Sequence, residues 1–265
     1  KVEERRKAER EAERRKQDRI AREKREKQRR QADNGKVIAA ASGTGFVVSK
    51  SGHIITNNHV INGCQEVKVH TKGDVYKAKV LRRDTVNDLA VIKASFQPSW
   101  VFPVSGENVG LMEEIYVAGY PFGARISSSV KITRGIVSSL SGIGDNFSQI
   151  QIDAALQPGN SGGPVFDKDG NALGVVVEGL DKLFYTEQYG DIPENTNFAI
   201  KGYVAKDFLK THGVKLEKPR KKVRPRFVTD LYINATHAIS CGVISKKNTF
   251  IEFLKKLARI INGME

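Results

Sequence analysis

Short runs of β-type sequence, separated by turn signals, fill most of this 265-residue chain. The runs are rich in Val, Ile, Phe and Tyr, as in "GFVVSKSGHIITNNHVI", "DLAVIKASF", "EIYVAGYPFG" and "GVVVEGL". Glycine-containing turns, such as those at 50–52, 72–74 and 169–171, divide the runs at close and fairly regular spacing. This pattern is typical of an antiparallel sandwich or barrel. We therefore expect an all-β core over residues 37–210, closed by a short helix that ends near Gly213.

The positive charge of the chain lies at its two ends. The formal net charge is +14, but residues 35–214 carry equal numbers of basic and acidic side chains. The excess of Lys and Arg is confined to residues 1–34 and 215–265. General attraction to polyanions therefore does not explain what the β-rich middle does.

Residues 1–34 have the composition of a solvated helix. The stretch "KVEERRKAEREAERRKQDRIAREKREKQRR" contains no Gly or Pro, and several Glu side chains precede Arg or Lys by three or four residues. It lacks a sustained apolar heptad seam. We predict a charged stalk or spacer, with binding to RNA or to an acidic surface as the alternative.

The C-terminal segment, 214–265, predicts a basic linker followed by an amphipathic helix. "KLEKPRKKVRPR" (215–226) contains two prolines and reads as an extended linker, whereas "NTFIEFLKKLARIING" has apolar residues at helical spacing. Packing onto the same protein is the first interpretation of that helix. Docking to a partner or to a membrane surface is the second.

Cysteine content gives little guidance on the compartment. Cys64 and Cys241 are too few for a disulfide scaffold, and they lack the spacing of metal ligands. A single disulfide between the two cysteines remains an open alternative. We expect no metal and no cofactor. No apolar run is long enough to span a membrane and no secretory signal is visible, but the chain begins at Lys1, so an upstream signal or anchor also stays open.

One serine stands in an unusual loop, "LQPGNSGGPVFD". Residues 159–164 contain three glycines and a proline around Ser161. Glycine is used where the backbone turns tightly or lets another molecule approach. A hairpin loop with an incidental serine is the simpler interpretation. A nucleophilic serine would need a general base, and that base would need a third group to orient it.

The sequence "GNSGG" also fits the G-x-S-x-G nucleophile elbow of α/β-hydrolases. That fold requires a helix directly after the serine, with an acid and a histidine further along. Here strand-like "PVFDKDGNALGVVV" follows, and the only downstream histidines are His212 and His237, at a helix end and in the tail. We exclude this fold.

A base and an acid stand upstream of Ser161 in the order histidine, aspartate, serine. His59 ends the apolar run "HIITNNHVI", and Asp88 begins "DLAVIK". Each alone would be read as structural, and His53, His70, Asp74 and Asp84 are competitors for the two roles. The joint order favours His59 and Asp88, because each stands at the edge of a predicted strand.

Five segments, "GTGFVVSKSGHIITNNHVI", "NDLAVIK", "VAGYPFG", "TRGIVSSL" and "QIDAALQPGNSGGPVFD", together resemble the trypsin-like serine proteases, and within them the HtrA/Deg branch. The resemblance spans about 40–210. It implies two six-stranded antiparallel Greek-key β-barrels with the active site in the cleft between them. Residues 35–110 would form the first barrel, with His59 and Asp88, and residues 111–213 the second, with Ser161.

The resemblance also implies roles for single residues. His59 would be the base, Asp88 its orienting acid and Ser161 the nucleophile. The oxyanion hole would be built from the backbone N–H groups of the loop Gly159, Asn160 and Ser161, with Gly159 and Ser161 as the donors and Asn160 shaping the loop.

Substrate binding follows from the same resemblance. Ala155 stands where trypsins that cut after Lys or Arg place an acid, and Leu156 and Leu180 match pocket positions of the HtrA branch. We therefore expect cleavage after small or medium aliphatic residues. The stretch ending in Val177, Glu178 and Gly179 would pair with an extended or unfolded polypeptide as an added strand.

The resemblance leaves other expectations open. HtrA proteins usually continue into PDZ domains, and the residues after 214 are too few for one, so regulation by PDZ-bound peptides is not expected. Trimerisation follows only from the family. Localisation in the bacterial cell envelope or periplasm, or tethered to a membrane, is favoured over the cytoplasm. Two alternative functions remain: a catalytically idle protease-fold scaffold, and a binder of acidic surfaces, RNA or membranes through 1–34 and 215–226.

Overall fold

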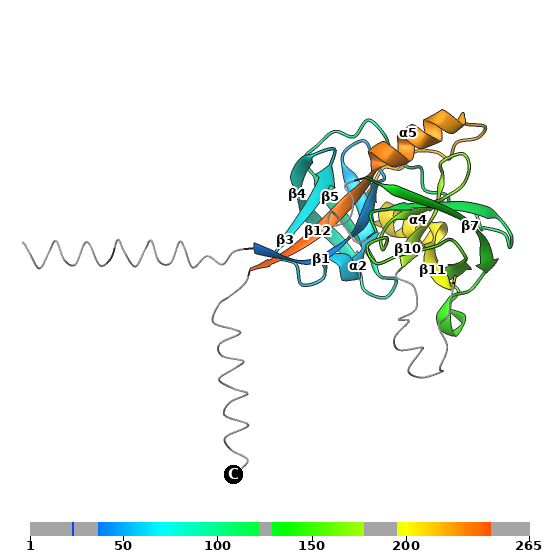
Figure 1. Ribbon diagram of the computed structural model, residues 1–265, viewed down its shortest axis with the longest axis horizontal. Helices are drawn as coiled ribbons and strands as arrows, with labels where there is room; N and C mark the ends of the chain where they lie inside the picture. Colours follow the sequence, from blue (N-terminus) through cyan, green and yellow to red (C-terminus); the bar gives the residue numbers. More distant parts are fainter. Residues whose placement is uncertain (1–22, 24–36, 122–128, 178–194, 245–265) are drawn as a thin grey trace, which may run out of the picture. The chain divides into compact units, whose positions relative to one another are not determined.

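The computed structural model describes residue 23 and residues 37–121, 129–177 and 195–244. Inter-residue contacts divide the chain into a large compact unit, Ala39–Val243, and a smaller unit of terminal residues. The large unit contains two closed six-stranded antiparallel barrels, as the sequence predicted (Figure 1). Most of the N-terminal segment 1–34 lies outside the described residues, and so does the predicted C-terminal helix over 248–263.

The first barrel is built from five consecutive strands and one strand from the far end of the chain. Its strand order is β1-β12-β3-β4-β5-β2. The strands are β1 (Val37–Val47), β2 (His53–Asn57), β3 (Glu66–Thr71), β4 (Asp74–Asp84), β5 (Leu89–Ala94) and β12 (Thr236–Ile244). A four-residue helix, α2 (Asn58–Ile61), follows β2 directly.

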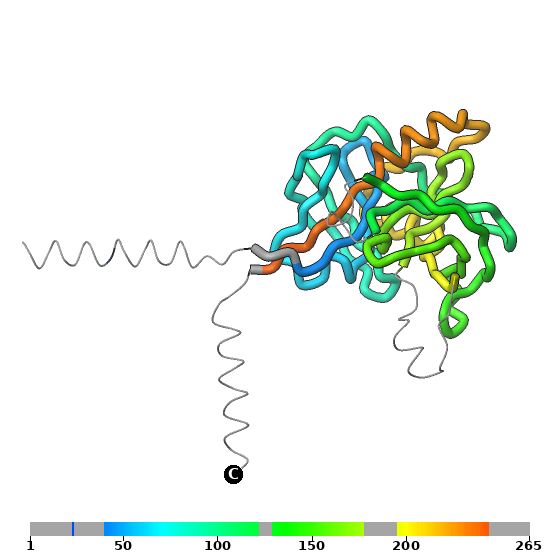
Figure 2. Tube along the Cα trace, in the orientation of Figure 1, coloured from blue at the N-terminus to red at the C-terminus, as the bar shows by residue number. Residues whose placement is uncertain are grey.

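Strand β12 corrects the predicted domain bounds. The sequence predicts a first barrel confined to 35–110, and a linker and one helix over 214–265. Instead, helix α5 (Pro225–Ala235) is followed by β12, which lies between β1 and β3 and closes the barrel (Figure 2). A disulfide joins Cys64, just before β3, to Cys241 of β12. The bridge that the sequence left open is therefore present.

The second barrel has the strand order β10-β11-β8-β7-β6-β9. Its strands are β6 (Glu114–Gly119), β7 (Lys131–Ser139), β8 (Gln149–Ile152), β9 (Pro164–Phe166), β10 (Ala172–Val177) and β11 (Asn197–Lys201). A short 3-10 helix, η2 (Ile143–Asp145), lies between β7 and β8. Helix α4 (Gly202–Thr211) follows β11, and Gly213 adopts the left-handed conformation just beyond it, as the sequence predicted.

A buried segment leads from β5 of the first barrel to β6 of the second. Val101, Phe102 and Val104 are almost fully buried. The N–H of Phe102 donates to the carbonyl of Val47 at 2.9 Å, and the N–H of Ala172 donates to the carbonyl of Pro103 at 2.8 Å. The connection therefore bonds to β1 on one side and to β10 on the other, which fixes the barrels against each other.

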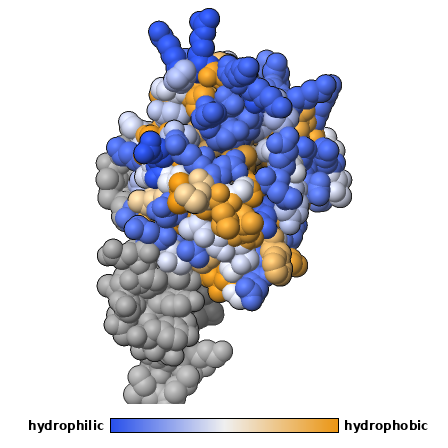
Figure 3. Space-filling view, turned by 90° about the vertical axis from the view of Figure 1, so that its right-hand side faces the viewer, coloured by the Kyte–Doolittle hydropathy of each residue, from blue (hydrophilic) through white to orange (hydrophobic). Residues whose placement is uncertain are grey.

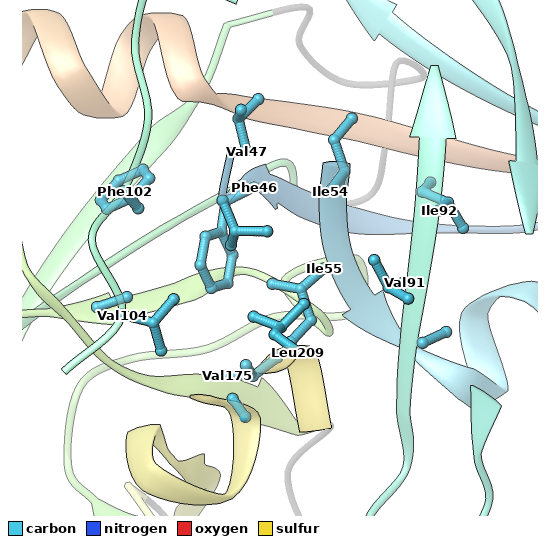
Figure 4. Packing of buried hydrophobic residues seen from close by; sticks show 14 of the residues in the cluster. Phe46, Val47, Ile54, Ile55, Val91, Ile92, Phe102, Val104, Val175 and Leu209 are labelled. Atoms are coloured by element: carbon cyan, nitrogen blue, oxygen red, sulfur yellow. The ribbon is translucent and has the colours of Figure 1, made fainter. Parts of the chain in front are cut away.

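The main hydrophobic core contains residues of the first barrel together with residues of β9, β10 and α4. Phe46 meets Phe102 edge to face at 5.4 Å between ring centroids, and Phe102 meets Phe166 of β9 at 5.5 Å. Figure 4 shows Phe46 and Phe102 near Val175 and Leu209, which come from β10 and α4. A smaller core fills the second barrel. Continuous packing of this kind makes the interface between the barrels rigid.

The predicted basic linker is a folded strap on the second barrel. Asn171 exchanges two hydrogen bonds with the backbone of Arg220, at 2.6 and 2.9 Å. The carboxylate of Asp169 accepts the N–H of Val223 at 3.0 Å. Pro225 then begins α5, a position that suits proline because its missing N–H would have no helical partner.

Charged and polar residues cover most of the face turned to the viewer in Figure 3, with hydrophobic residues gathered near its centre. Among the described residues, the large hydrophobic side chains that remain exposed include Leu111, Met112, Ile143 and Phe147 of the second barrel. Within the described part of the chain, no helix is long and apolar enough to cross a membrane.

Candidate active site

Strand pairing brings His59 and Asp88 together. Strands β2 and β5 pair antiparallel, with Asn57 opposite Leu89. His59 lies two residues after the end of β2, and Asp88 lies one residue before β5. The imidazole Nδ1 of His59 is 2.6 Å from Oδ2 of Asp88, and the backbone N–H of His59 donates to Oδ1 at 2.8 Å. Both carboxylate oxygens are thus used to hold the histidine.

The backbone of Asp88 is held in an uncommon conformation. Its φ is 52°, in the left-handed region that non-glycine residues rarely adopt. Its carbonyl accepts hydrogen bonds from the N–H of Asn58 at 3.1 Å and from the side-chain amide of Asn57 at 3.0 Å. These bonds hold the strained residue, and such strain is concentrated at functional sites. A carboxylate at Nδ1 favours the tautomer in which Nδ1 carries the proton and Nε2 is the basic nitrogen.

The loop that carries Ser161 is pressed against the first barrel. Gly159 and Gly162 have φ values of 102° and 85°. A Cβ atom on Gly162 would lie 2.2 Å from the carbonyl oxygen of Thr44 and 2.4 Å from the hydroxyl of Thr56. Only glycine fits this conformation and this space. The loop therefore docks on β1 and on the end of β2, the strand that leads to His59.

The backbone of Ser161 lies next to α2. A Cβ atom on Gly43 would approach both the side chain of Val60, at 2.6 Å, and the carbonyl oxygen of Ser161, at 3.0 Å. Val60 is the residue after His59. The structure thus joins His59 to Asp88 directly and brings Ser161 to the same side of the interface.

The amides of the Ser161 loop are not equivalent. The N–H of Asn160 donates to the carbonyl of Gln157 at 3.0 Å, so it is already committed inside the loop. Within the described residues, the N–H groups of Gly159 and Ser161 donate to no backbone oxygen. Asn160 therefore has the loop-shaping position expected for it, and its N–H does not offer an open donor.

The predicted substrate-binding residues are only partly described. Ala155 is exposed, and Leu156 packs against the smaller core. Val177 ends β10 and pairs with Phe198 of β11. Glu178, Gly179 and Leu180 lie outside the described residues.

The competing histidines have other partners. Nδ1 of His53 is 2.7 Å from the hydroxyl of Ser49, and Nε2 of His70 is 2.7 Å from the hydroxyl of Ser240. Burial lowers the pKa of both histidines, with a smaller contribution from a nearby lysine. Among the histidines of the described chain, His59 alone lies within hydrogen-bond distance of a carboxylate.

The competing aspartates, Asp84 and Asp74, occupy other positions in the first barrel. Asp84 accepts the N–H groups of Val86 and Asn87, each at 3.0 Å, and so closes the turn before β5. Asp74 begins β4, opposite Thr71. Neither carboxylate is bonded to a histidine among the described residues.

A sequence profile described as a trypsin-like peptidase domain matches residues 43–175, which include His59, Asp88 and Ser161. The chain belongs to the trypsin-like serine protease family. Its similarity is to the HtrA/Deg branch, because a probable periplasmic serine endoprotease, DegP-like, from Hahella chejuensis is 35% identical over 176 residues. That match covers 64% of this trypsin-like chain and 35% of the relative.

The chain also matches an uncharacterised protein and a solved structure of a serine endoprotease. An uncharacterised protein, y4bJ, from Sinorhizobium fredii is 41% identical over 180 residues, which cover 68% of this chain and 28% of that protein. The crystal structure of the serine endoprotease from Yersinia pestis superimposes with a TM-score of 0.53 at 27% identity, covering 65% of this chain and 58% of the other. The trypsin-like chain thus spans about a third of the length of these curated relatives.

Two features of the site were not identified from the sequence. The side chain of Thr44 contacts the Ser161 loop, and the Cys64–Cys241 bridge ties β12 to the end of α2. The "GTG" around Thr44 is a visible signal, since a polar residue between two glycines is unusual in a buried strand.

Proposed function

We propose that this protein is a serine endopeptidase that cleaves extended or unfolded polypeptides. The observation that carries the proposal is the His59–Asp88 pair, held by two hydrogen bonds at 2.6 and 2.8 Å, beside a glycine-shaped loop that presents Ser161. Membership of the trypsin-like family supports the same assignment.

Each residue has a defined step in the proposed reaction. His59 Nε2 removes the proton of the Ser161 hydroxyl while Oγ forms a bond to the substrate carbonyl carbon, and the carbonyl electrons move onto oxygen. Asp88 stabilises the resulting imidazolium. His59 then donates its proton to the leaving amine as the C–N bond breaks. A water molecule hydrolyses the acyl-enzyme by the same path in reverse.

The open amides of the loop are the proposed oxyanion donors. The N–H groups of Gly159 and Ser161 would point at the oxygen that becomes negative, and such preorganised donors stabilise the transition state more than the substrate. Loss of one donor costs about 3 kcal/mol in activation free energy in a reference serine protease.

Specificity for small or medium aliphatic residues follows from the neutral pocket expected around Ala155, Leu156 and Leu180. A lysine or arginine buried there would lack a counter-charge, which is costly. The outer side of β10 near Val177, continued by Glu178 and Gly179, would pair with the substrate backbone.

A panel of fluorogenic peptides tests this function. We expect cleavage after Val, Ala or Leu, with cleavage after Arg much slower. Ser161→Ala should abolish turnover, whereas Ser240→Ala should leave it unchanged, because the His70–Ser240 pair has no carboxylate partner among the described residues. Preference for Arg would overturn the pocket, and turnover by Ser161→Ala would overturn the nucleophile.

An idle protease-fold scaffold is the second candidate. Such a protein would keep the protease fold and bind polypeptides, but it would not cleave them. Absence of cleavage across the whole panel, together with binding of the same peptides to the folded protein, would favour the scaffold.

We propose the bacterial envelope as the compartment. DegP-like relatives are named as periplasmic, and the Cys64–Cys241 disulfide fits an oxidising environment.

We also propose that basic residues bind an anionic surface such as RNA or a membrane. These residues are the exposed lysines of the strap, such as Lys221 and Lys222, and the Lys and Arg residues of segment 1–34. Such binding would weaken steeply with salt. A homotrimer is proposed from the family alone.

A further inference from the structure

The structure assigns a positioning role to Thr44, a residue of β1 in the first barrel. We infer that its hydroxyl holds the Ser161 loop in the arrangement that forms the oxyanion hole. This inference rests on the proposed function.

Thr44 is fully buried at the junction of the two barrels and makes hydrogen bonds to both. Its N–H donates to the carbonyl of Ser161 at 2.9 Å, and its carbonyl accepts the hydroxyl of Thr56 at 2.7 Å. Its hydroxyl donates to the carbonyl of Gly159 at 2.7 Å and accepts the N–H of Tyr120 at 3.0 Å.

The direction of these hydroxyl bonds is fixed by chemistry. The N–H of Tyr120 can only donate, so the Thr44 oxygen must accept from it. The hydroxyl proton is then available for the Gly159 carbonyl, which can only accept. One hydroxyl therefore satisfies a buried donor after β6 and a carbonyl of the nucleophile loop at once.

The anchored carbonyls lie on either side of Asn160. Thr44 holds the carbonyl of Gly159 with its side chain and the carbonyl of Ser161 with its backbone. Glycine has unusual rotational freedom, and Gly159, with φ of 102°, is the residue whose own N–H is an oxyanion donor. The Thr44 hydroxyl fixes the Gly159–Asn160 peptide. The preceding peptide, which carries the Gly159 N–H, is therefore restrained at the Cα atom that it shares with the anchored one.

The other contacts between Thr44 and the Ser161 loop do not restrain the Gly159 carbonyl. Gly162 and Gly163 pack against the main chain and methyl group of Thr44, and these contacts would survive loss of the hydroxyl. Without the hydroxyl, the Tyr120 N–H would be buried and unpaired, and Gly159 would be free to turn. The predicted defect is therefore in transition-state stabilisation and not in substrate binding.

Two pairs of variants isolate the hydroxyl. Thr44→Val keeps the shape of the wild-type side chain and lacks only the hydroxyl. Thr44→Ala and Thr44→Ser differ from each other in the same way and leave more room, so this pair remains informative if Thr44→Val does not fold.

We expect kcat, counted per site that a fluorophosphonate probe titrates, to fall by about 10- to 100-fold in Thr44→Val and Thr44→Ala. KM should stay within about 2-fold, because ground-state binding does not use the hole. Thr44→Ser should recover kcat to within about 3-fold of wild type. Affinity for a peptide boronate, whose tetrahedral adduct occupies the hole, should fall in parallel with kcat.

A purely structural role predicts different results. Fewer folded molecules would titrate, but kcat per titrated site would be unchanged in every variant. That result, or a loss in Thr44→Ser as large as in Thr44→Ala, would overturn the assignment.

Failure of the proposed function can be distinguished from failure of the Thr44 inference. If wild-type protein neither titrates nor cleaves, hydrogen exchange at the Tyr120 amide and over 157–163 still reports on the anchor. The Thr44→Ala variant should then exchange at least about 10-fold faster than Thr44→Ser at these amides. Equal exchange would overturn the anchor without reference to catalysis.

Discussion

At the scale of single residues, the site depends on side chains that other residue types could not replace. Asp88 uses both carboxylate oxygens on His59, and Gly162 occupies space that a methyl group cannot enter. The order of His59, Asp88 and Ser161 could be read from the sequence, because each stands at a strand edge. The role of Thr44 could not, because the "GTG" around it marks an unusual position but does not indicate which groups its hydroxyl bonds.

Asp88→Asn tests the orientation of His59. An amide can still accept the His59 N–H, but its NH₂ group facing Nδ1 favours the wrong tautomer. We expect kcat to fall by roughly 10³- to 10⁴-fold, as in the reference serine protease, with little change in KM. Asp84→Asn is the matched control, since Asp84 closes a turn and should change kcat by less than about 3-fold. An equal effect of the two substitutions would contradict the assignment.

Gly162→Ala tests the docking of the Ser161 loop. A Cβ atom would meet the carbonyl oxygen of Thr44 at 2.2 Å in a backbone conformation with φ of 85°. We expect the free energy of unfolding to drop by about 2–4 kcal/mol in urea titrations. Gly73→Ala has similarly positive φ but open surroundings and should cost only about 1 kcal/mol. Similar losses for both would show that the loop is not tightly docked.

At the scale of elements, local patterns predicted most strands but not how the first barrel closes. Alternation and turn residues mark β2 to β11 because each pairs with a strand near it in sequence. Strand β12 pairs with β3 across a sequence separation of about 170 residues. Its sequence, "THAISCGVI", mixes small, polar and apolar residues because it packs between two strands and carries the disulfide. Local periodicity therefore could not assign it to this barrel.

The disulfide should stabilise the docking of β12. It closes a loop with a sequence separation of 177 residues, and long loops lose the most chain entropy when closed. Reduction should lower the free energy of unfolding by about 3–5 kcal/mol. Urea unfolding with and without dithiothreitol measures this, with the double variant Cys64→Ser/Cys241→Ser as a control that dithiothreitol should not affect. No shift on reduction of the wild type would mean that β12 docks without help from the bridge.

At the scale of the whole molecule, the main hydrophobic core includes residues of both barrels, and one histidine, His237, is buried while His53 and His70 are half-buried. His237 of β12 is 2% exposed, and burial, with a smaller effect of Lys72, lowers its pKa from 6.5 to about 4. His53 and His70 have lowered pKa values for the same main reason. The fold therefore favours the neutral form of each of these histidines, most strongly for His237.

Stability should consequently fall in acid. Between pH 6.5 and about 4 the unfolded chain binds a proton at His237 while the folded chain does not. This difference costs about 3 kcal/mol by pH 4, and His53 and His70 add to it with the same sign. Thermal unfolding from pH 7.5 to 4.5 measures the loss. His237→Phe should flatten the profile, and an unchanged slope in that variant would assign the acid sensitivity elsewhere.

The most direct test of the central claim is to map the covalent adduct of a fluorophosphonate probe by peptide mass spectrometry. The account predicts one adduct, on Ser161, absent in Ser161→Ala, retained in Ser240→Ala and formed far more slowly in His59→Ala. A folded wild-type protein without an adduct, or an adduct on another serine, would contradict it.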